Sequence, residues 1–319
     1  MPLERPRVTP HLKRALQFAV WLLVLVAIAV AVVSSGPIRQ LVSDAAHNLN
    51  ATAVLVMLPV QLASAALCAL ALRAFAPGVS YWGCLGSRFL RDAAGNLPFV
   101  PPGTSEAAGA RALVLAGGGT RQAIVASTLD KTAEILAQVP YIMLAAWLLF
   151  RGWQPSRDFH LRPEWVLGAV LVVALGMAAW LRFGRRGALA ARLLEEWHKL
   201  IEEVREQRSG MPVSTLLHLV AWMMGGVQVW LAALALGYDI GLYEAIAIES
   251  AAYAGRAVLF FIPAGLVAQE AGLVAAGLLF GLDPAQSLAL GLAMRMRDLV
   301  FGLPLLAWPM VEMRRHRSA

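Results

Sequence analysis

Apolar runs long enough to cross a lipid bilayer recur along the chain and constrain its fold more than any other feature. Hydrophobic residues make up 59% and charged residues 15% of the 319 residues, whereas soluble domains average about 45–50% and about 25%. The sequence therefore predicts an all-α polytopic membrane protein, a single transmembrane domain over 1–319 with about seven spanning helices. A spanning helix needs roughly 20 mostly apolar residues, and we expect such helices at about 15–34, 51–74, 120–150, 163–182, 212–236, 242–261 and 284–310.

Basic residues gather in segments that lie between or beside these runs, and the formal net charge of the chain is +7. The N-terminal tail, the segment 183–210 and the C-terminal tail hold most of them. Because loops on the cytoplasmic side carry an excess of Lys and Arg, we expect all three in the cytoplasm, both termini included. No basic face alternates with aromatic residues, so the charge does not indicate nucleic-acid binding.

Two polar segments are interpreted from their patterns. In the segment from about 185 to 209, Leu189, Leu193 and Trp197 recur at four-residue steps, which predicts an amphipathic helix on the cytoplasmic membrane surface. The segment 35–50 has one Arg and no Lys, and we interpret it as a polar loop.

Proline-rich breaks interrupt two apolar regions. "LPFVPPG" at 97–103 separates two pieces, about 80–96 and 104–116, each too short to cross the membrane. "FFIPAG" at 260–265 precedes a short helix at about 266–280. Proline ends a helix because it lacks the N–H and clashes with the preceding turn. Broken backbone inside a membrane is tolerated where protein or a water-filled cavity satisfies it, so we predict two re-entrant hairpins.

A triplet of charged residues occurs twice with identical internal spacing. Glu106, Lys131 and Glu134 form the first triplet, and Glu270, Arg295 and Asp298 form the second. Each residue of the second triplet therefore follows its counterpart in the first by the same number of residues. This number, the separation between Glu106 and Glu270 in the sequence, is called the repeat offset. Each triplet follows one of the proline breaks, which predicts an internal repeat with units at about 80–150 and 242–310. Three expected crossings, 120–150, 163–182 and 212–236, lie between the first hairpin and the second repeat unit. The hairpins therefore enter from opposite sides, as in the inverted repeats of many transporters.

Charged residues within membrane helices need partners or water. A charge at the bilayer centre costs about 2.5–3.5 kcal/mol on the translocon scale, so the six triplet residues are expected to face one another or a cavity. One interpretation is a structural ion-pair network that holds the hairpins to the helices. The other is a polar cavity at mid-depth that contacts a charged lipid headgroup or couples to ions, and intramembrane ionisable residues are usually functional.

Four further residues join the candidate lipid-binding set. Arg88, Arg91 and Asn96 lie on the first hairpin, and Arg256 occupies the corresponding place on the second. Arginine suits a phosphate group because its planar fork donates two parallel hydrogen bonds, although an arginine near a helix end also reaches toward the membrane surface. The six His and two Cys show no metal spacing, and no nucleophile or phosphate-loop motif appears, so we expect no catalytic residue, metal or cofactor.

Two segments resemble a known family. "FFIPAGLVAQEAG" and "MRMRDLVFGLP" within 249–304, together with "GNLPFVPPGTSEAAGARALVLAGG" in 95–138, resemble the lysylphosphatidylglycerol-synthase transmembrane (flippase-like) superfamily, with the hopanoid-associated HpnL-type branch nearest. The resemblance implies a bacterial inner-membrane protein that handles or flips lipids. In the lysyl-lipid synthases an aminoacyltransferase domain follows the membrane part. Because this sequence stops at Ala319, we expect that activity to be absent.

The resemblance and the charged triplets lead to one main hypothesis. We expect a lipid translocator that binds the headgroup of a phospholipid or a hopanoid in a polar cavity. Two alternatives stay open: a membrane-embedded enzyme that modifies a lipid, and a scaffold for enzymes of hopanoid or lipid biosynthesis. The expected partners are membrane lipids and, in the scaffold case, such enzymes.

Overall fold

The computed structural model describes residues 34–96, 103–152, 202, 205, 208–258 and 265–306, and every regular element in these ranges is helical. The predicted all-α class is therefore confirmed. The spans expected at 15–34 and 163–182, the amphipathic segment 185–209 and the two proline breaks lie wholly or largely outside the described residues.

The helices begin and end close to the expected positions. Among the described residues, α3 and α9 are the two helices long and apolar enough to cross a membrane. The predicted number of about seven spans stays a prediction. The helices are α2 (Gly36–Asn48), α3 (Ala51–Arg73), α4 (Tyr81–Gly95), α5 (Thr104–Leu115), α6 (Thr120–Gly152), α9 (Met211–Ala235), α10 (Leu242–Val258), α11 (Gly265–Leu279) and α12 (Pro284–Leu306), with a 3-10 turn η1 (Arg208–Gly210) before α9.

The interpretation of 35–50 as a loop was wrong. Residues 36–48 form α2, which starts with Pro37 in its first turn, a position where the missing N–H costs nothing. Ala45 is its buried residue, and the helix packs against α12. The apolar residues Ile38, Leu41, Val42 and Ala45 of α2 recur at three- and four-residue steps, a helical stripe that the interpretation by polar composition overlooked.

The helices α3 and α9 pack side by side in opposite directions. The Asn50 side chain caps α3 by accepting from the Ala53 N–H at 2.8 Å, and it donates to the carbonyl oxygen of Ala235 at 2.9 Å. Farther along, Ser64 Oγ lies 3.4 Å from the Ala221 carbonyl oxygen. The start of α3 therefore lies beside the end of α9, and their midpoints meet.

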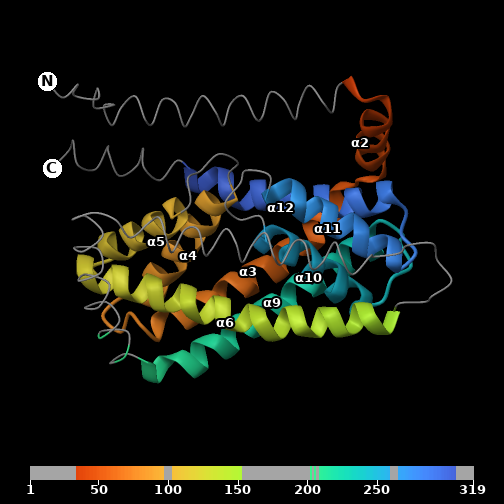
Figure 1. Ribbon diagram of the computed structural model, residues 1–319. Coiled ribbons are helices and arrows are strands. Elements are labelled where there is room, and N and C mark those ends of the chain that lie inside the picture. Colours follow the sequence, from red (N-terminus) through yellow and green to blue (C-terminus); the bar gives the residue numbers. More distant parts are fainter. Residues whose placement is uncertain are drawn as a thin grey trace, which may run out of the picture.

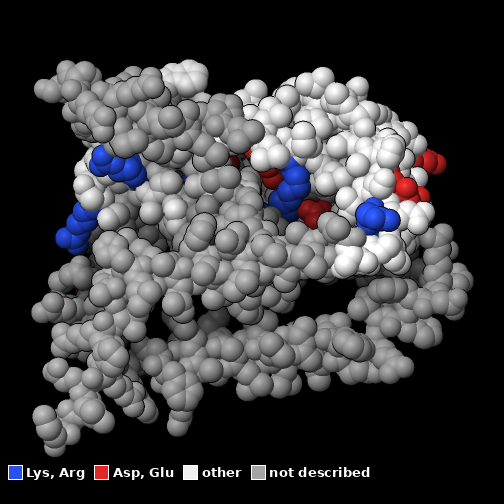
Figure 2. All heavy atoms as spheres, turned by 90° about the horizontal axis from the view of Figure 1, so that it is seen from above, with Lys and Arg blue, Asp and Glu red and all other residues white. Residues whose placement is uncertain are grey.

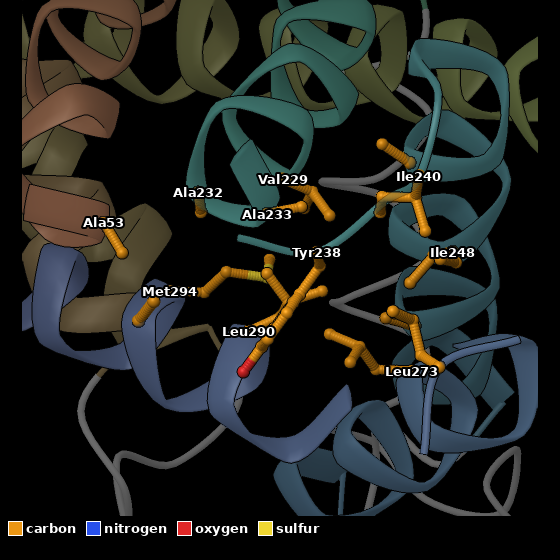
Figure 3. Close-up of a cluster of buried hydrophobic side chains, with 14 of the residues drawn as sticks. Ala53, Val229, Ala232, Ala233, Tyr238, Ile240, Ile248, Leu273, Leu290 and Met294 are labelled. Carbon is orange, nitrogen blue, oxygen red and sulfur yellow. The ribbon is translucent and has the colours of Figure 1, made fainter. Parts of the chain in front are cut away.

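Two apolar cores lie at opposite ends of this helix pair. The first, called the Tyr238 core, joins α3, α9, α10, α11 and α12, and Figure 3 shows the Tyr238 ring among its side chains, beside Leu290. The second, called the Phe75 core, joins α3, α4, α5 and α6 around Phe75, Leu113 and Leu129. Because Met57 belongs to the first core and Ala69 to the second, the middle of α3 lies between them.

Two helix pairs flank the long helices. In Figure 1, α4 and α5 lie toward one end of α3, α6 and α9, whereas α10 and α11 lie toward the other end, and α12 runs along the top. The members of each pair pack together. Gly272 of α11 lies so close to α10 that an added Cβ would be 2.7 Å from the Ala251 carbonyl oxygen.

The two short helices α5 and α11 end in the same turn. Gly117 and Gly281 follow them with φ of 98° and 87°, a conformation that favours glycine. In each turn the next amide reaches back to a carbonyl oxygen five residues earlier, Gly118 to Leu113 and Leu282 to Gly277, both at 3.0 Å. The repeat offset separates the two glycines, and it also separates the starts of α6 and α12. These helix ends recur at the repeat offset, and the two repeat units stay a prediction.

Close packing of α9 on α10 yields a first prediction. A Cβ at Gly226 would lie 2.4 Å from Ile246 Cγ1 and 2.8 Å from Ile246 Cα, so Gly226→Ala forces the two helices apart. Overpacking costs about 1–3 kcal/mol, more than the roughly 1 kcal/mol that alanine gains over glycine in a helix. We expect a lower melting temperature in detergent. Gly86→Ala is the control, because open space surrounds that helical position. A melting temperature of Gly226→Ala equal to or above that of the wild type would contradict the described packing.

Candidate functional site

A cavity of about 310 Å³ lies between the two apolar cores, at the lower end of the volumes of ligand pockets. Gln61 and Ser64 line it from the middle of α3, and Trp222 lines it from the middle of α9. The cavity therefore lies near half the depth of the two apolar helices. In Figure 2 acidic and basic side chains are seen together in a hollow near the middle of the view. The charged side chains that line the cavity are Arg88, Arg91, Asp92, Glu106, Lys131, Glu134, Glu249, Arg256, Arg297 and Asp298.

A network of ion pairs centred on Glu134 joins α4 to α6. Arg91 Nη1 donates to Asp130 Oδ2 at 2.7 Å, and its Nη2 donates to Glu134 Oε2 at 3.1 Å. Arg88 donates to Asp92 at 2.8 Å and to Glu134 at 3.2 Å. The guanidinium groups of both arginines therefore point toward carboxylates of α4 and α6.

His218 of α9 extends this network. Its Nε2 lies 2.8 Å from Asp130 Oδ1, and its Nδ1 lies 3.6 Å from the thiol of Cys68. The side chains of His218 and Asp130 are both fully buried. The sequence did not reveal His218, because a single histidine in an apolar run has no partner at a recognisable spacing. Its position opposite Cys68 follows from the antiparallel packing of α3 and α9.

Each predicted charge triplet forms one contiguous cluster. In the first, Lys131 Nζ lies 4.0 Å from Glu106 Oε1 and 3.1 Å from Glu134 Oε2. In the second, Arg295 Nε lies 2.9 Å from Glu270 Oε1, and Nη1 lies 3.7 Å from Asp298 Oδ2. The repeat offset therefore selected residues that contact one another.

The first charge cluster lines the cavity, whereas the second lines it only in part. Asp298 and all three members of the first triplet are among the described lining residues, whereas Glu270 and Arg295 lie beside the cavity rather than in its wall. Arg297, the residue beside Asp298, does line the cavity. It pairs with Asp298 at 2.7 Å and donates to the amide oxygen of Gln228. Arg297 and Gln228 were missed because neither has a charged counterpart at the repeat offset.

Arg256 stands apart from the paired arginines. Its Nη2 donates to the carbonyl oxygen of Gly95 at 3.1 Å, which joins α10 to the end of α4. Within the described part of the chain, no carboxylate lies within 4.0 Å of this guanidinium. Asn96 lines the cavity next to it. Arg256 therefore keeps hydrogen-bond donors that can meet an anionic ligand.

Glu249 is an acidic residue that lies among aromatic rings. The hydroxyl of Tyr141 donates to Glu249 Oε2, and the Glu249 residue is only 2% exposed. Trp222 lies beside both tyrosines of this region, with ring centroids 5.8 Å from Tyr141 and 4.8 Å from Tyr253. Tyr141 was another residue that the sequence did not single out.

Within the described ranges, no group of three or more His, Cys, Asp or Glu side chains is arranged to hold a metal ion. Cys68 and Cys84 are free and buried. The ionisable groups that line the described cavity are instead mostly joined in pairs of opposite charge.

Apolar helices packed around a charged internal cavity define an all-helical membrane protein with a polar site inside it. Among known families, the one described as the lysylphosphatidylglycerol synthase TM region matches residues 14–305, and the chain belongs to this family. It is a membrane protein involved in lipid metabolism or transport. Comparison with curated proteins and with solved structures found no match. Nearness to the hopanoid-associated branch stays a prediction.

The Glu134 network yields a second prediction, on stability. Replacing Arg91 by Met leaves Asp130 and Glu134 buried with less compensating charge, and breaking a buried pair costs about 3–5 kcal/mol. We expect a large drop in the melting temperature in detergent. Lys131→Met is the matched control, because the Lys131 side chain is 42% exposed and its pairs are worth about 0–1 kcal/mol. Equal losses in the two variants would show that burial does not set the strength of this network.

Proposed function

We propose that the protein is a lipid translocator of a bacterial inner membrane, with both termini in the cytoplasm. In this proposal a lipid headgroup enters the cavity between the Tyr238 core and the Phe75 core, while the acyl or hopanoid part stays in the bilayer. The family supports a role in lipid metabolism or transport. The translocation of a headgroup is our extension of that role.

The position of the charged cavity carries the proposal. A polar headgroup that crosses a membrane loses its water, and a charge at the bilayer centre costs several kcal/mol. A cavity lined by ion pairs at half the depth of α3 and α9 lowers that cost, because its fixed charges replace the lost water. A network that served only to hold helices together would not need to line a cavity of about 310 Å³.

Arg256 is the residue that we assign to the headgroup. Its guanidinium has donors without a carboxylate partner among the described residues, and it lies in the cavity wall beside Asn96. A guanidinium matches a phosphate group through two parallel hydrogen bonds. Lys131 is half-exposed and adds positive charge to the cavity wall. Glu106 pairs with Lys131, while Glu134 and Asp298 hold the other basic side chains of the wall.

Access from both sides is proposed to come from the inverted repeat. The pairs α4–α5 and α10–α11 lie toward opposite ends of the long helices, and their short helices end in matching turns. In transporters with inverted repeats, one unit rocks against the other around a central site. The ion pair between Arg295 and Glu270 then links α12 to α11 and moves with the second unit.

The third prediction tests translocation with purified protein in proteoliposomes. Labelled phospholipids and a labelled hopanoid are placed in one leaflet, and their headgroups are tested for access from the other side. We expect protein-dependent movement, reduced at least about tenfold by Arg256→Ala, because a hydrogen bond to a charged group is worth about 1.5–3 kcal/mol. Arg73→Ala is the control, since Arg73 is exposed and does not line the cavity.

The same experiment separates the alternatives. If no lipid class moves, hopanoids included, the translocator is wrong. A chemically altered lipid recovered from the vesicles would then favour an enzyme. Lipid that is neither moved nor altered would favour a scaffold, for which Arg256→Ala leaves cellular lipid composition unchanged.

A further inference from the structure

Among the described residues, Glu249 is the acid of the cavity wall that has no basic partner. Among the described lining residues, each of the other four acids lies within 4.0 Å of a lysine or arginine nitrogen. Glu249 has no such contact within the described part of the chain. The partners of the other four are Arg88 for Asp92, Lys131 for Glu106, Arg88, Arg91 and Lys131 for Glu134, and Arg295 and Arg297 for Asp298.

The surroundings of Glu249 supply one hydrogen-bond donor and enclose the carboxylate. The Tyr141 hydroxyl of α6 donates to Oε2. The other oxygen, Oε1, packs against Gly225 of α9, where an added Cβ would lie 2.2 Å away. Glycine at 225 therefore leaves room for Oε1 itself, which lies where a side chain would begin. At 2% exposure the enclosed carboxylate does not admit a lipid amine or another bulky cation.

Other ionisable groups lie on the helices around Glu249. From α12, Arg297 and Asp298 line the same cavity, but they are paired with each other. Tyr253 lies one turn farther along α10, and His218 of α9 is bound to Asp130. On α11 the acid is Glu270, which pairs with Arg295. None of these groups supplies a cation in contact with Glu249.

A buried carboxylate without a basic partner costs several kcal/mol, and the smallest cation that removes this cost is a proton. We propose that Glu249 is a proton-binding site that couples headgroup movement to a proton gradient, an inference that rests on the proposed translocator. One proton from cavity water adds to Oε1 and converts the carboxylate to a carboxylic acid, while Tyr141 keeps its bond to Oε2. Release to water on the other side reverses the step.

The charge of the cavity wall explains how a proton and a headgroup are coupled. Five basic and five acidic residues line the described cavity, so its charges balance when all are ionised. Protonation of Glu249 leaves one net positive charge, which favours an anionic, phosphate-bearing headgroup. By linkage, a bound anion favours the proton to the same degree. Proton and headgroup therefore cross in the same direction.

The fourth prediction uses full-length protein in proteoliposomes with labelled phosphatidylglycerol and an imposed pH gradient. Coupling to one proton sets a limit of about tenfold in the leaflet ratio per pH unit. We expect the wild type to accumulate lipid in the leaflet on the alkaline side, and a protonophore to abolish this. In Glu249→Gln the leaflet ratio of the lipid is the same with and without a pH gradient, so the gradient-driven accumulation is lost. Glu244→Gln, on the same helix but outside the cavity wall, keeps the wild-type response.

Two outcomes of this experiment overturn the proton site: downhill movement in the wild type that ignores the gradient, and a gradient response that survives in Glu249→Gln. Absence of any movement instead contradicts the translocator itself.

Infrared difference spectra between acidic and alkaline pH test the site without transport. The wild type should show a protonated-carboxyl band that titrates and is missing in Glu249→Gln, whereas Glu244→Gln retains it and Tyr141→Phe shifts it. A wild type without this band, or a Glu249→Gln protein that still shows it, overturns the proposal even if no lipid moves.

Discussion

The burial of Arg91 between Asp130 and Glu134 is the interaction on which the rest of the structure depends. These charges lie where water is scarce, so each must keep its partner, and the partners come from α4 and α6. The same contacts hold the short α4–α5 pair against a long helix. Arg91 and Glu134 also line the cavity between the Tyr238 core and the Phe75 core, so the same ion pairs stabilise the fold and form part of the cavity wall.

Much of the fold could be predicted from the sequence, because a membrane restricts a chain to few structures. Apolar runs located α3 and α9, and proline and glycine marked where α4, α5 and α11 end. The helix α2 was missed because its short apolar stripe, Ile38, Leu41, Val42 and Ala45, lies in a segment that is polar on average. How the helices pack could not be predicted, since close approaches such as Gly226 against Ile246 depend on three-dimensional fit.

The candidate site was predicted in part. The repeat offset identified Glu106, Lys131, Glu134 and Asp298, which line the cavity, along with Glu270 and Arg295 beside it. His218, Arg297 and Tyr141 were missed, because their partners lie on distant helices and their spacing follows no repeat. The two charges without a salt-bridge partner in the described cavity wall, Arg256 and Glu249, became distinct only once the other pairs were known.

The central claim is that a lipid headgroup reaches the middle of the bundle. Its most direct test is crosslinking with a phospholipid that carries a photoreactive group on the headgroup, followed by mass spectrometry of the modified peptides. The account predicts crosslinks to cavity residues at mid-depth, such as Trp222 on α9 and Asn96 beside α10, that excess unlabelled lipid removes. Crosslinks confined to the ends of α3 and α9 would contradict it.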